Sequence, residues 1–96
     1  MASHAWDVNW TKGTREQFLA IRAEIIEGGI PEENANGIAL YVLEGNRQKG
    51  ERYPSHSHTV MRTAQSARPE TIEKYSQLFE DMVSSGKNFD SFDEIN

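Results

Sequence analysis

The chain has 96 residues and a net charge of −5, with 36% hydrophobic and 26% charged residues, a composition typical of a folded domain. The absence of cysteine excludes a disulfide framework, a thiolate zinc site and a cysteine nucleophile. No apolar run approaches the ~18 residues that span a bilayer, and the N-terminal "MASHAWDVNW" lacks the features of a secretory signal. We therefore expect residues 1–96 to form one small globular domain in the cytoplasm, without membrane contact.

Two tryptophans, Trp6 and Trp10, precede the first predicted helix. A tryptophan at such a position either caps a hydrophobic core or lies on an exposed apolar patch. In the second case both side chains would belong to a surface that binds a partner.

The first predicted helix covers residues 14–27. Thr14 and Gln17 have the spacing of a capping box, and the pair Gly28-Gly29 is expected to end the helix. Helical periodicity places six apolar residues on one broad face: Phe18, Leu19, Ile21, Ala23, Ile25 and Ile26.

Arg22 lies in the middle of this apolar face. One interpretation is that its long stem covers apolar neighbours while the guanidinium reaches water. The other is that Arg22 contacts a partner or pairs with a buried carboxylate, because arginine is enriched at such places. We include it among the candidate partner-binding residues.

The middle segment supports two interpretations. Pro31 followed by Glu32 and Glu33 is typical of a helix start, where acidic side chains favour the positive end of the helix dipole. The run Ile38–Leu43 is apolar on both faces, so its periodicity does not separate a buried helix from a central strand. We expect a mainly α domain of three or four helices, the alternative being an α+β fold in which residues 38–62 form a hairpin packed on two helices.

Positive charge is concentrated in residues 45–68, which carry five bases against one acid, a balance of +4. Residues 1–44 have a balance of −4 and residues 69–96 a balance of −5. Basic side chains mixed with small polar ones and an aromatic ring suit contacts with an acidic protein surface, or with phosphates and a stacked base. The candidate partner-binding residues of this segment are Arg47, Lys49, Arg52, Tyr53, His56, His58, Arg62 and Arg68.

The pair His56-Ser57-His58 suggests a metal site at first sight. Two histidines separated by one residue point to the same side only in extended backbone, and a zinc site needs at least a third protein ligand. Arg62 and Thr63 stand where a nearby glutamate ligand would be expected, and His4 could be a third ligand only if the N-terminus folded back. No catalytic or cofactor motif is present. We expect no metal, no cofactor and no enzymatic activity.

The last predicted helix starts at Pro69, a residue suited to the first helical position, and Gly86 is the expected C-cap. A helix-turn-helix formed with the preceding residues 58–68 is a further, weaker interpretation. The apolar stripe of the helix consists of Ile72, Tyr75, Phe79, Met82 and Val83.

The C-terminal segment 87–96 alternates Phe89 and Phe92 with acidic residues. Segments of this composition either fold back on the domain or form a flexible tail that docks onto a basic groove. Phe89 and Phe92 are therefore candidate partner-binding residues as well.

From these features we expect a non-enzymatic, small acidic protein that docks onto a larger macromolecule and modulates or inhibits it. Accessory regulators of the kind that phages use have this profile. The expected partner is a protein, and a homodimer is also expected. The alternative is a nucleic-acid-binding protein that uses the basic segment 47–68.

Overall fold

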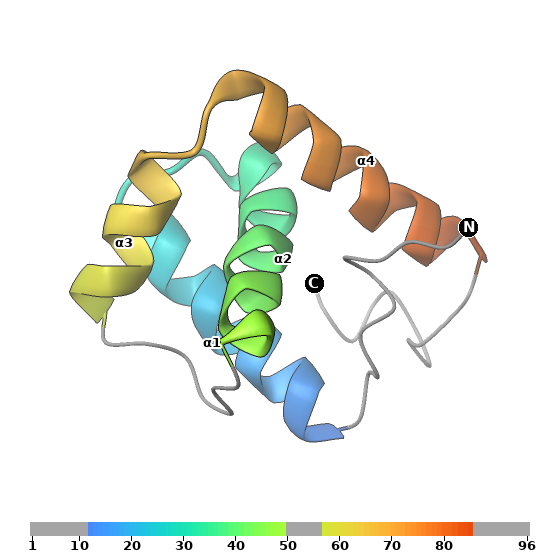
Figure 1. Cartoon of the computed structure of the whole chain (residues 1–96), viewed down its shortest axis with the longest axis horizontal. Helices are drawn as coiled ribbons and strands as arrows, with labels where there is room; N and C mark the ends of the chain where they lie inside the picture. Colours follow the sequence, from blue (N-terminus) through green and yellow to red (C-terminus); the bar gives the residue numbers. More distant parts are fainter. Residues whose placement is uncertain (1–11, 50–56, 86–96) are drawn as a thin grey trace.

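The computed structural model describes residues 12–49 and 57–85 and forms a helical domain, as predicted (Figure 1). Within these ranges there are four helices: α1 (Lys12–Glu27), α2 (Glu32–Gln48), α3 (Ser57–Gln65) and α4 (Pro69–Ser85). No described helix is both long and apolar enough to cross a bilayer. Trp6, Trp10, Gly86 and the tail 87–96 lie outside the described residues.

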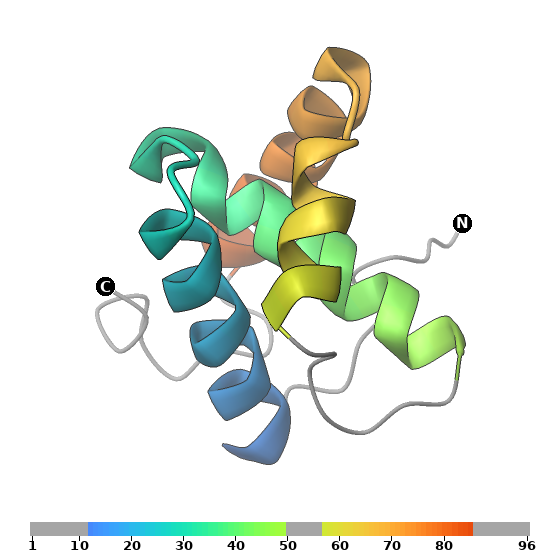
Figure 2. The ribbon, with the colours of Figure 1, turned by 90° about the vertical axis from the view of Figure 1, so that its left-hand side faces the viewer.

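Helix α2 is the centre of the fold and packs against the other three helices, while α1 also contacts α3. Figure 2 shows α3 lying in front of α2, between α1 and the start of α4. The run Ile38–Leu43 is helical because neighbours cover α2 on several sides, and a helix covered in this way can be apolar all round. The hairpin alternative over residues 38–62 is therefore wrong.

The hydrophobic core contains residues from all four helices. Phe18 of α1 stacks on Phe79 of α4, with ring centroids 5.6 Å apart and planes 6° apart. Of the predicted apolar face of α1, only Ala23 is exposed. The buried core residues are Phe18, Ile21, Ile25, Ala35, Ile38, Ala39, Leu40, Val42, Leu43, Val60, Ala64, Phe79 and Met82.

The end of α1 was predicted correctly and has a clear backbone cause. Gly29 adopts a φ of +107°, which glycine reaches without steric cost. The amide of Gly29 donates to the carbonyl of Ile26 (3.1 Å), and the amide of Ile30 donates to that of Ile25 (3.2 Å). This is a Schellman motif, which satisfies carbonyls that the helix end would otherwise leave without donors.

The start of α1 was predicted two residues too late. The helix begins at Lys12, so Thr14 already has helical backbone and is not the N-cap of a capping box with Gln17. The starts of α2 and α4 match the prediction. Pro31 is the N-cap residue before α2, and Pro69 is the first residue of α4.

Helices α2 and α4 approach each other closely at Gly37. A Cβ atom added to Gly37 would lie 2.7 Å from the backbone nitrogen of Ser76 and 2.8 Å from its Cα. A side chain at this position would collide with the backbone of α4, so glycine permits the close crossing of the two helices.

Candidate functional site

The structure describes six of the thirteen candidate partner-binding residues, and these are divided between internal contacts and the surface. Those described are Arg22, Arg47, Lys49, His58, Arg62 and Arg68. Those outside the described residues are Trp6, Trp10, Arg52, Tyr53, His56, Phe89 and Phe92.

Arg22 connects α1 to the first turns of α2. Its Nε donates to Oδ1 of Asn36 at 2.6 Å, and its Nη2 lies 3.4 Å from Oε2 of Glu32. The side chain is 15% exposed, whereas the Glu32 side chain is 74% exposed. The guanidinium thus pairs with a carboxylate at the surface of the same chain, and a role in partner binding stays a prediction.

Arg47 pairs with a buried acid one helical turn earlier. Its Nε and Nη2 donate to the two carboxylate oxygens of Glu44 at 2.9 and 2.6 Å, and Gln48 donates to the same carboxylate at 3.1 Å. The Glu44 side chain is 4% exposed, so this bidentate pairing compensates for burying its charge. Arg47 is therefore already committed to a contact inside the domain.

The carboxylate of Glu44 also affects a tyrosine on α4. Tyr75 packs against Tyr41 of α2, with ring centroids 5.2 Å apart. Burial raises the pKa of Tyr75, and the negative charge of Glu44 and the neighbouring Tyr41 raise it further. The Lys74 ammonium lies over the Tyr75 ring, 5.5 Å from its centroid.

The outward face of α3 carries polar and basic side chains. His58, Arg62 and Gln65 follow the i, i+4, i+7 spacing and are all exposed. Val60 and Ala64, which are 0% and 2% exposed, attach the opposite face to the core. The sequence from position 57 to position 69 has no carboxylate. A short helix thus presents one polar, basic face to solvent.

The charged side chains of three exposed residues make no hydrogen bond or ion pair in the described part of the chain: Lys49, Arg62 and Arg68. Arg22 and Arg47 pair internally, and Lys74 lies over an aromatic ring. The three uncommitted cations, Lys49, Arg62 and Arg68, all belong to the basic segment 47–68, and their charges remain available for an external contact. That any of them binds a partner stays a prediction.

The predicted helix-turn-helix is not supported by packing. Residues 66–68 connect α3 to α4 through a short turn, but the two helices make almost no contact with each other. A helix-turn-helix requires its two helices to pack together so that the second is held in the major groove. In addition, the first turns of α4 carry Glu70 and Glu73, which would face phosphates unfavourably.

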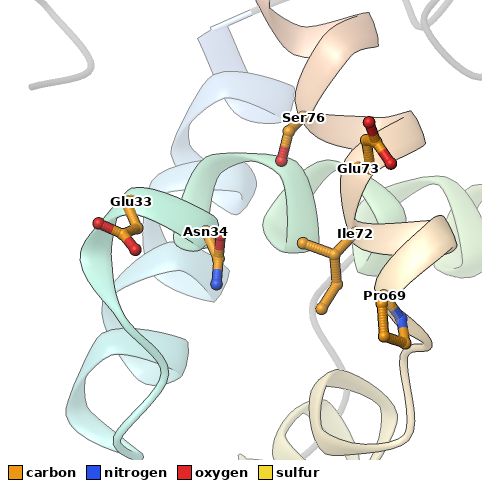
Figure 3. A pocket seen from close by; sticks show the side chains of 6 residues that line it. All are labelled: Glu33, Asn34, Pro69, Ile72, Glu73 and Ser76. Atoms are coloured by element: carbon orange, nitrogen blue, oxygen red, sulfur yellow. The ribbon is translucent and has the colours of Figure 1, made fainter.

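A groove that the sequence did not predict lies between the start of α2 and the first turns of α4 (Figure 3). It has a volume of about 530 Å³ and is open to solvent. The carboxylates of Glu33 and Glu73 stand at opposite sides, and Ile72 points toward Asn34 across the gap. The six residues that line it are Glu33, Asn34, Pro69, Ile72, Glu73 and Ser76.

Of the two histidines considered for a metal site, His56 and His58, the structure describes only His58. His58 is exposed on α3, and its ring Nε2 lies 3.4 Å from Oγ1 of Thr59. Among residues 12–49 and 57–85, no group of three or more histidine, aspartate or glutamate side chains could hold a metal ion. His56 lies outside those ranges.

The described chain is thus a four-helix α domain with a basic helix face and an acidic groove. The sequence matches no protein-family model and no curated protein, and the fold matches no solved structure.

Proposed function

We propose that this chain is a non-enzymatic interaction protein that docks onto an acidic surface of a larger protein through the outward face of α3. The observation that carries the proposal is the distribution of uncommitted cations. Lys49, Arg62 and Arg68 are exposed and make no ion pair within the described residues. They lie directly after α2, on α3 and directly before α4, respectively.

The exposed polar face of α3 is suited to such a contact. It combines one arginine with a histidine and a glutamine, and an arginine fork donates to a carboxylate with defined geometry. Charge complementarity of this kind mainly steers the encounter and fixes the orientation of the complex. We further propose that the complex forms in the cytoplasm and that docking modulates or inhibits the partner, as expected of an accessory regulator.

The rival function is nucleic-acid binding by the same segment. Basic residues without nearby acids also suit phosphate. The acidic first turns of α4 follow Arg68 directly, however, with Glu70 and Glu73 both exposed. A duplex or strand that reached beyond α3 would meet these carboxylates, which favours a protein partner of limited size.

The test is affinity capture from host lysate with the full chain and two variants. Arg62→Gln/Arg68→Gln removes two uncommitted cations, and Lys74→Gln removes an exposed charge from α4 as the matched control. We expect the captured partner to be lost with the double variant and retained with the control. Equal capture by both variants would refute the proposal, and salt-dependent binding of a labelled duplex or single strand would favour the rival.

A further inference from the structure

The acidic groove between α2 and α4 differs in character from the α3 face. Its apolar part is formed by Ile72, which is half-buried, and by Pro69, which is exposed. Asn34 and Ser76 add polar groups that are half-buried. The close crossing at Gly37 and Ser76 fixes the distance between the two helices at this point.

The charge at the groove is negative and uncompensated within the described residues. Glu33 and Glu73 are both exposed, and neither makes an ion pair among residues 12–49 and 57–85. Glu70 adds a third carboxylate on the first turn of α4. No cation is among the six residues that line the groove. Arg22 pairs with Glu32, Lys74 lies over the Tyr75 ring, and Arg68 directly precedes the groove residue Pro69 without pairing with Glu33 or Glu73.

We propose that this groove binds a basic peptide segment of the partner, with an arginine or lysine as its main contact. The long aliphatic stem of such a residue would pack on Ile72 and Pro69, and its charged end would lie between Glu33 and Glu73. The amide of Asn34 and the hydroxyl of Ser76 would hydrogen-bond to the peptide backbone. The inference extends the proposed function, because it presupposes a partner protein, but it concerns a separate surface.

The experiment titrates an acetylated tri-arginine peptide into the full chain and follows backbone and side-chain amides by NMR. The reference probe is the tri-citrulline peptide, which has nearly the same shape and no charge. We expect the arginine peptide to shift the signals of Asn34, Ile72 and Ser76. Citrulline should leave them nearly unchanged.

Two double variants locate the effect. Glu33→Gln/Glu73→Gln should weaken binding by about three- to tenfold, as expected for the loss of two solvent-exposed charge contacts. Glu16→Gln/Glu27→Gln removes two exposed carboxylates from α1 and should leave binding unchanged.

Several results would overturn the proposal. These are equal shifts with citrulline, equal binding by the Glu33→Gln/Glu73→Gln variant, or shifts that depend on protein concentration and disappear with Arg68→Gln. The last result would assign the groove to a second copy of the chain. The probe does not involve α3, so failure here leaves the capture experiment on Arg62 and Arg68 unaffected, and the reverse also holds.

Discussion

Replacing Gly37 with alanine tests the arrangement of the two longest helices, α2 and α4. The new Cβ would lie 2.7 and 2.8 Å from backbone atoms of Ser76, closer than the 3.0 Å below which real Cβ atoms are essentially never found. Because the obstacle is the backbone of α4, a change of side-chain rotamer cannot relieve it. The two helices must move apart.

The expected cost follows from two opposing effects. Overpacking of a well-packed site costs about 1–3 kcal/mol. Alanine in a helix interior gains about 0.8–1 kcal/mol over glycine. Because rigid backbone is the obstacle, we expect the upper part of the overpacking range and a net loss of about 1–2 kcal/mol in the free energy of unfolding.

Gly45→Ala provides the matched control on the same helix. Nothing lies within 4 Å of a Cβ added at Gly45. Only the gain in helix propensity remains there, and the variant should be stabilised by about 0.8–1 kcal/mol. The same substitution at two positions of α2 should therefore shift stability in opposite directions.

Urea denaturation followed by circular dichroism measures both variants, with the free energy of unfolding obtained by linear extrapolation. If Gly37→Ala stabilised the protein as much as Gly45→Ala, the close approach of α2 and α4 at this point would be refuted. The double variant Gly37→Ala/Ser76→Gly adds a second check. It removes the hydroxyl but not the backbone of residue 76, so it should recover little of the lost stability.

Two further predictions concern the end of α1 and the tyrosine on α4. Gly29→Ala should destabilise the chain by about 1–2 kcal/mol in the same urea assay, because a φ of +107° strains any residue with a Cβ; an unchanged midpoint would contradict the Schellman geometry. The pKa of Tyr75, followed by ultraviolet absorbance, should lie above the ordinary tyrosine value of 10.0. Glu44→Gln should lower this pKa only part of the way, because burial is the larger cause. The folded state holds this proton more tightly than the unfolded chain, so the contribution to stability is complete below pH 10 and is lost as the pH rises through the pKa of the folded state.

Helix α4 was predictable from the sequence because its apolar stripe is regular and Pro69 marks its start. Helix α2 was ambiguous for the opposite reason, since the run Ile38–Leu43 is buried on both faces and has no period to detect. Helix α3 was not predicted as a separate element, and a helix over residues 58–68 entered only through the weaker helix-turn-helix interpretation. Helix α3 has nine residues, and only Val60 and Ala64 are fully buried, so its helical state depends on packing against α1 and α2.

The contacts of the candidate site residues also differ in how far apart the partners lie in the sequence. Arg47 and Glu44 are three residues apart, so their pairing follows from local sequence once this segment is known to be helical, but the sequence analysis assigned Arg47 to partner binding instead. The contact of Arg22 with Asn36 spans fourteen residues and needs the α1–α2 packing. Glu33 and Glu73 both line the groove. In the sequence, each is explained by its place near a helix start, where the dipole favours an acid, so neither predicts a shared site. Only the crossing at Gly37 places them on one surface.

The two proposed surfaces meet at the turn between α3 and α4, and this restricts how a partner could use both. Arg68 belongs to the basic surface, and Pro69, the next residue, lines the acidic groove. A partner that bound both surfaces would need an acidic patch opposite the basic surface and, next to it, a basic segment opposite the acidic groove. Reversing that order would place like charges opposite each other, which costs binding energy and excludes the wrong orientation. Arg68→Gln should therefore weaken the orientation preference of the complex more than Lys49→Gln, which removes an uncommitted cation at the far end of α2.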